Sequence, residues 1–238
     1  MRQRFFAIPS LLAIPSLLAP LSMLSCAAPG QHAAEQVVIR PNEVADFGLL
    51  YAQNCSGCHG ENGQGALTVA IGKPVYLAIA DDPTIRHVIE EGRAGTAMQA
   101  FSQKTGGFLT DAQIDILVRG IRAWSQPGSL INNRPPAYAA SLTGDAARGQ
   151  DVFAGNCSSC HGAGGRGARA VADPSYLALV SDQHLRTVVI AGMPNLGMPD
   201  WRGHPRPLSE ADVTDVVAWL AMQRKPLSAS LNHEGGSK

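Results

Sequence analysis

An internal repeat constrains this chain more than any other feature of its sequence. The region from about Gly48 to Trp124 resembles the region from about Gly149 to Gln223, and residues 82–92 align with residues 182–192 without a gap. Two copies of this length predict two similar folding units. The 238 residues therefore form two domains of modest size rather than one large domain.

The apolar pattern of each copy predicts helices. Thr110 and Ser209 are candidate N-caps at equivalent places, each before a run in which apolar residues recur at helical spacing. These residues are Ile114, Leu117, Val118 and Ile121 in the first copy, and Val213, Val216, Val217 and Leu220 in the second. Each copy contains three readable helices, so we expect an all-α fold whose core is made of these stripes.

The stretch between the two copies is unsuited to helix. Pro127, Gly128, Pro135 and Pro136 favour extended chain there, and the C-terminal residues are rich in Ser and Gly. We divide the chain into an export signal (1–25), a tether (26–42), a first domain (43–126), a linker (127–140), a second domain (141–226) and a disordered tail (227–238).

The N-terminal residues have the profile of an export signal. Arg2 and Arg4 precede an uncharged stretch that runs to Cys26, and its prolines disfavour a permanent transmembrane helix. Residues 23–26 resemble the lipobox of bacterial lipoproteins, in which the Cys is acylated. Cleavage near Ala27 by an ordinary signal peptidase and retention as an uncleaved anchor are the alternatives. In each case we expect the folded part outside the cytoplasm. The lipobox resemblance predicts that lipidation of Cys26 anchors it on the periplasmic side of a bacterial membrane.

Charge and composition exclude some partners and suggest a cofactor. The 19 Lys and Arg residues balance the 19 Asp and Glu residues and are scattered, which gives no indication of nucleic acid binding. His204, between Arg202 and Arg206, lies in a small basic patch that is a weak candidate for docking. Aromatic residues make up only 5% of the chain, so each domain has a thin core that a large apolar cofactor would fill.

Four of the five cysteines form two motifs with the same spacing, and Cys26 is the fifth. The motifs are Cys55-Ser-Gly-Cys58-His59 and Cys157-Ser-Ser-Cys160-His161. Thiols one helical turn apart can reach two vinyl groups of one porphyrin, and the following His can bind its iron. A thioredoxin-like redox pair and a zinc site built from both pairs are the competing readings. The motif occurs twice at equivalent positions in an exported chain, which predicts two c-type haems.

The repeat alignment also selects a second axial ligand for each haem. It places Met98 over Met198, in a Gly-rich loop between two helices, with Met193 as a nearby competitor in the second copy. Pro74 and Pro174 coincide between each His and its Met. They are either ordinary loop prolines or residues whose carbonyl oxygen accepts the remaining N–H of the proximal imidazole.

With these residues in place, each copy resembles a class I c-type cytochrome, and the whole chain resembles a diheme cytochrome made by tandem duplication. The resemblance covers residues 46–223. It implies an all-helical fold around each haem, with His59 and Met98 on one iron and His161 and Met198 on the other. Gln99 departs from the family pattern, in which Pro is frequent, as at Pro199.

Two strong protein ligands on each iron leave no open coordination position, so we expect one-electron transfer and no small-molecule substrate. The predicted function is a periplasmic carrier between a donor enzyme or complex and an acceptor such as a terminal oxidase or a reaction centre. The alternatives are a diheme oxidoreductase, such as a sulfur-compound dehydrogenase or a peroxidase, and a haem subunit of a larger respiratory complex. An open distal position on one haem would favour the oxidoreductase.

Overall fold

A computed structural model describes residues 39–125, 130, 134–167 and 169–224. These residues form helices and turns and no β-strand, which confirms the predicted all-α fold. The predicted export signal, most of the tether, part of the linker and the tail lie outside the described residues, as does Cys26. The domain boundaries drawn from the sequence stay predictions.

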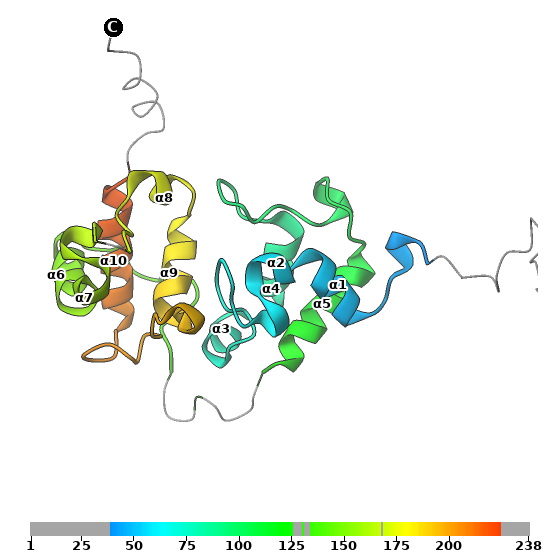
Figure 1. Ribbon diagram of the computed structural model, residues 1–238, viewed down its shortest axis with the longest axis horizontal. Helices are drawn as coiled ribbons and strands as arrows, with labels where there is room; N and C mark the ends of the chain where they lie inside the picture. Colours follow the sequence, from blue (N-terminus) through cyan, green and yellow to red (C-terminus); the bar gives the residue numbers. More distant parts are fainter. Residues whose placement is uncertain (1–38, 126–129, 131–133, 168, 225–238) are drawn as a thin grey trace, which may run out of the picture. The chain divides into compact units, whose positions relative to one another are not determined.

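Both repeats contain the same order of five α-helices. The first repeat contains α1 (Phe47–Asn54), α2 (Ser56–His59), α3 (Pro74–Ile79), α4 (Asp82–Glu91) and α5 (Asp111–Ala123). The second contains α6 (Ala146–Asn156), α7 (Ser158–His161), α8 (Pro174–Ala178), α9 (Asp182–Ala191) and α10 (Glu210–Met222). The first long helix packs against the last in each repeat, α1 against α5 and α6 against α10 (Figure 1).

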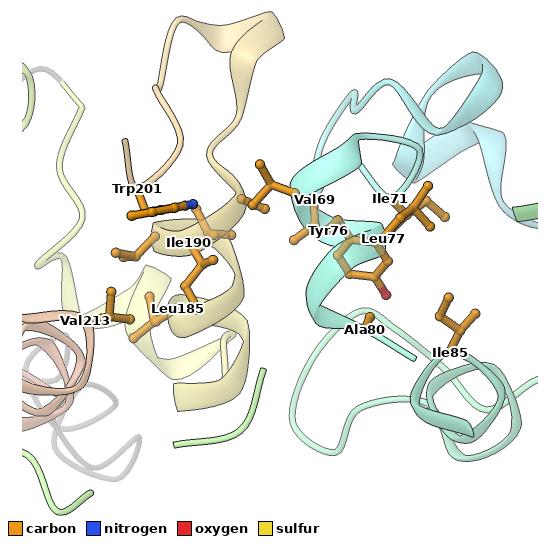
Figure 2. Packing of buried hydrophobic residues seen from close by; sticks show 14 of the residues in the cluster. Val69, Ile71, Tyr76, Leu77, Ala80, Ile85, Leu185, Ile190, Trp201 and Val213 are labelled. Atoms are coloured by element: carbon orange, nitrogen blue, oxygen red, sulfur yellow. The ribbon is translucent and has the colours of Figure 1, made fainter. Parts of the chain in front are cut away.

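The last helix of each repeat begins where the sequence predicted. The hydroxyl of Thr110 accepts a hydrogen bond from the backbone N–H of Gln113 at 3.2 Å, and the hydroxyl of Ser209 accepts one from Asp212 at 3.2 Å. Each therefore satisfies a backbone donor that the first turn of a helix leaves without a partner. The apolar stripes that follow are buried. In the second repeat they meet Leu185 and Ile190, and Figure 2 shows Trp201 beside Ile190 in this core.

The crossing of the first and last helices depends on a glycine in each repeat, but the glycine lies on opposite helices. A Cβ atom on Gly149 of α6 would stand 2.0 Å from the backbone oxygen of Asp215 in α10. In the first repeat the close approach is at Gly120 of α5, where a Cβ would stand 2.0 Å from the ring of Phe47 in α1. Gly48 is the sequence equivalent of Gly149, yet a Cβ there would meet only Asp46, at 3.3 Å.

We expect Gly149→Ala to destabilise the protein more than Gly120→Ala. The added methyl group at residue 149 meets backbone, so α10 must move, and overpacking of this kind costs about 1–3 kcal/mol. At residue 120 the obstacle is a half-buried ring that can rotate, and alanine gains about 0.5–1 kcal/mol in helix propensity over glycine. Chemical denaturation of the haem-loaded protein, followed by far-ultraviolet circular dichroism, measures both. Equal effects would contradict the difference between the two crossings.

Candidate haem-binding sites

The two Cys-x-x-Cys-His motifs have the same backbone geometry. Cys55 follows α1 with its N–H bonded to the carbonyl of Tyr51 at 2.9 Å, and the N–H of His59 bonds to the carbonyl of Cys55 at 3.0 Å. Cys157 and His161 make the equivalent bonds at 2.9 Å and 3.0 Å. A single helical turn therefore carries both thiols and the imidazole in each repeat, as the spacing predicted.

A glycine ends each motif directly after the histidine. Gly60 has φ of 76° and ψ of 165°, and Gly162 has φ of 78° and ψ of 166°. This region of backbone space is open essentially to glycine alone. A Cβ would also stand 2.8 Å from Gly65 at the first position and 2.5 Å from Gly167 at the second. The chain therefore turns sharply after each histidine.

The first thiol of each motif lacks a property that a dithiol redox pair needs. Such a pair works through a thiolate, which requires a lowered pKa. Burial instead raises the pKa of the Cys55 thiol to about 12 and that of the Cys157 thiol to about 11. Cys58 and Cys160, the second cysteines of the two motifs, are exposed. The described residues hold no group of three His, Cys, Asp or Glu side chains arranged for a metal ion.

A backbone carbonyl orients each imidazole. Nδ1 of His59 lies 2.9 Å from the oxygen of Val69, and Nδ1 of His161 lies 2.7 Å from the oxygen of Arg169. A carbonyl oxygen only accepts, so Nδ1 donates and Nε2 keeps the lone pair with which a neutral histidine binds a metal. Burial also lowers the pKa of His59, which favours the neutral ring.

The prolines do not supply these carbonyl groups. Pro74 and Pro174 are the first residues of α3 and α8, where the missing N–H costs nothing and the fixed φ suits a helix. These are therefore ordinary prolines, and the prediction that their carbonyl oxygens accept from the imidazoles is wrong. The sequence did not lead us to predict that Val69 and Arg169 accept from the imidazoles, although each stands five residues before the proline of its copy. This equal spacing is the signal that could have found them.

The loops that carry Met98 and Met198 close in the same way. The carbonyl of Met98 accepts from the N–H of Arg93 at 2.7 Å, and the carbonyl of Met198 accepts from the N–H of Met193 at 3.0 Å. The loops begin at Gly92 and Gly192, which have φ of 65° and 68°. Gln99 stands where the second repeat has a proline, and the same loop forms around it.

Both predicted methionine ligands lie partly buried against the apolar core of their repeat. Met193 is also partly buried there, so burial alone does not separate it from Met198. The backbone does separate them, because Met198 occupies the loop position of Met98, whereas Met193 occupies that of Arg93.

The basic patch around His204 does not present free cations. Arg202 pairs with Asp200 at 2.6 Å, and Arg206 pairs with Asp212 at 2.7 Å. The Arg206 side chain helps to hold the pKa of Asp212 well below its usual range, while Asp212 also closes the N-cap of α10. These ion pairs stabilise their own loop, and docking at this patch stays a prediction.

Comparison with protein families identifies the family to which the two repeats belong. The model of the family described as "Cytochrome C oxidase, cbb3-type, subunit III" matches residues 42–119 and, separately, residues 144–220. The chain belongs to this family. The family matches each repeat once, which confirms the predicted pair of cytochrome c units and the two c-type haems, one at each Cys-x-x-Cys-His motif.

Curated relatives of this cbb3-type subunit III family member are cytochrome c proteins. The cytochrome bc1 complex cytochrome c subunit of Mycobacterium bovis is 28% identical over 176 residues, which is 72% of this chain and 60% of that protein. The cbb3-type cytochrome c oxidase subunit CcoP of Azospirillum sp. is 32% identical over 50% of this chain and 40% of that protein. Cytochrome c6 of Picosynechococcus sp. is 39% identical over 37% of this chain and 78% of that protein. The chain thus spans less than two thirds of the length of the Mycobacterium bovis and Azospirillum subunits.

The residues of each repeat fit a c-type haem. Each repeat offers two thiols on one helical turn, an imidazole with Nε2 free for a metal, and a thioether in a glycine-anchored loop. A haem bound there supplies one-electron redox chemistry at its iron. The chain itself would attach the porphyrin, orient the imidazole and position the methionine.

Proposed function

We propose that His59 and Met98 ligate one haem iron and that His161 and Met198 ligate the other. The observation that carries this proposal is the equivalence of the two repeats. Each pairs an imidazole oriented through Nδ1 with a methionine at the same place in a loop closed by the same backbone bond. Both repeats keep this arrangement although neighbouring residues differ, as Gln99 and Pro199 do.

With both irons six-coordinate, the protein carries single electrons between a donor enzyme or complex and a terminal acceptor, an oxidase or a reaction centre. An imidazole and a thioether on each iron would leave no coordination position open, which disfavours substrate chemistry at the metal. The partners are redox proteins.

A second candidate is a haem subunit of a larger respiratory complex. The names of the mycobacterial and Azospirillum relatives favour it, since both are subunits of such complexes. The chemistry of the two haems is the same in both candidates. Co-purification from native membranes separates them, because a subunit keeps its partners and a free carrier does not.

We also propose that the protein works on the periplasmic side of a bacterial membrane, anchored through lipid on Cys26. Within residues 39–125, 134–167 and 169–224, no helix combines the length and the apolar character needed to cross a bilayer.

The carrier function is tested by adding carbon monoxide to the reduced protein. We expect both haems to take up one electron each in a reductive titration and the absorption spectrum to stay unchanged under carbon monoxide, because Met98 and Met198 occupy the distal positions. A haem that binds carbon monoxide readily in the native protein has an open position. That outcome would contradict the carrier and favour the diheme oxidoreductase.

A further inference from the structure

The two methionine loops differ in how they are held, at the residue two positions before the methionine. In the first repeat the hydroxyl of Thr96 donates to the carbonyl of Arg93 at 2.8 Å and accepts from the N–H of Met98 at 3.1 Å. The second repeat has Leu196 at this position, which has no hydroxyl and is 53% exposed. The loop of Met198 therefore lacks the internal side-chain tie of the first loop.

Arg169 makes a contact in the second repeat that Val69 cannot make in the first. Its guanidinium Nη1 lies 3.4 Å from the carbonyl oxygen of Leu196, in the methionine loop. Its own carbonyl accepts from Nδ1 of His161 at 2.7 Å. One residue thus contacts both the proximal histidine and the loop of the distal methionine. Val69 provides only the carbonyl, and its apolar side chain is buried.

We infer that Arg169 is a positioning residue, whose guanidinium holds the Met198 loop in the second repeat as the Thr96 hydroxyl holds the Met98 loop in the first. The inference rests on the proposed ligation of iron by Met198. Residues 194–197 are all exposed, and a cationic donor makes a stronger hydrogen bond to a carbonyl than a neutral one does. Loss of the guanidinium should let the thioether leave the iron more readily.

The test is imidazole binding to the oxidised, haem-loaded protein, followed by the weak near-infrared sulfur-to-iron absorption band. Imidazole competes with the thioether, so a looser loop raises its apparent affinity. Measurement in the Met98→Ala background leaves Met198 as the only source of the band. There, Arg169→Ala should raise the imidazole affinity about two- to tenfold, the effect of one net hydrogen bond, while it keeps the carbonyl that orients His161. Arg169→Lys should restore part of the difference.

Arg166→Ala is the matched control, because Arg166 is exposed in the same loop and carries the same charge but makes no hydrogen bond or ion pair with the described residues. We expect its imidazole affinity to equal that of the background. Equal shifts in the Arg166→Ala and Arg169→Ala proteins, or no shift in either, would overturn the positioning role. Absence of the band from the Met98→Ala background itself would instead contradict the proposed Met198 ligation, so the two failures are distinguishable.

Discussion

Replacement of Met198 by alanine should remove half of the sulfur-to-iron band of the oxidised protein, whereas replacement of Met193 should leave the band unchanged. Both side chains lie partly buried against the same core, so a role in packing alone predicts similar effects. Ligation predicts different effects, because only Met198 occupies the loop position of Met98. The haem that loses its methionine should also fall in reduction potential and bind added cyanide or carbon monoxide more tightly.

Met98→Ala provides the matched comparison for this prediction. It should remove the other half of the band, and the double variant should have none. If Met193→Ala lowers the band while Met198→Ala does not, the second haem uses the competing methionine and the alignment of the two loops misleads. If neither variant lowers it, the second iron has a different distal ligand.

The sequence allowed a sound prediction of the local structure, because the relevant signals are local. Thr110 and Ser209 cap their helices through a backbone N–H three residues away, and the stripes that follow are buried because they repeat with the period of a helix. The Cys-x-x-Cys-His motifs are equally local, since one helical turn places the two thiols and the imidazole.

Contacts between distant segments were harder to predict. Val69 and Arg169 act through a backbone carbonyl, which every residue has, so the type of residue gives no sign of the role. Gly48 and Gly149 align, but a glycine matters at a helix crossing only if the neighbouring helix approaches it closely. In the first repeat the large ring at the crossing comes from α1, through Phe47, and the small residue from α5. Duplicated sequences can therefore conserve a packing contact while they exchange the helices that provide its two sides.

The difference between the methionine loops follows the same logic. The Thr96 hydroxyl makes hydrogen bonds within its own loop. The second repeat has Leu196 at this position, and there the guanidinium of Arg169 contacts the loop from outside it. Repeats that diverge in this way can keep the same ligands while the strength of each iron–sulfur bond changes separately. Two haems of one carrier can thereby acquire different potentials without any change in their ligands.

Replacement of Cys26 by alanine should move the protein from the membrane fraction to the soluble fraction, or block its processing. Cys26 lies outside the described residues, and the prediction depends on its lipobox-like surroundings. Each buried methylene of an acyl chain contributes about 0.8 kcal/mol to membrane binding, so loss of the lipid should change the partition almost completely. Fractionation, with labelling by a radioactive fatty acid, measures both events.

Ser25→Ala is the neighbouring control for Cys26→Ala, because it keeps the thiol that would be acylated and should leave both the label and the membrane fraction as they are. The two haems should remain attached in the released Cys26→Ala protein, since the Cys-x-x-Cys-His motifs lie outside the tether. The size of the mature chain distinguishes release from a block in processing. A Cys26→Ala protein that is processed normally and still sediments with membranes would contradict the lipid anchor, and would indicate attachment through a partner or an uncleaved N-terminal segment.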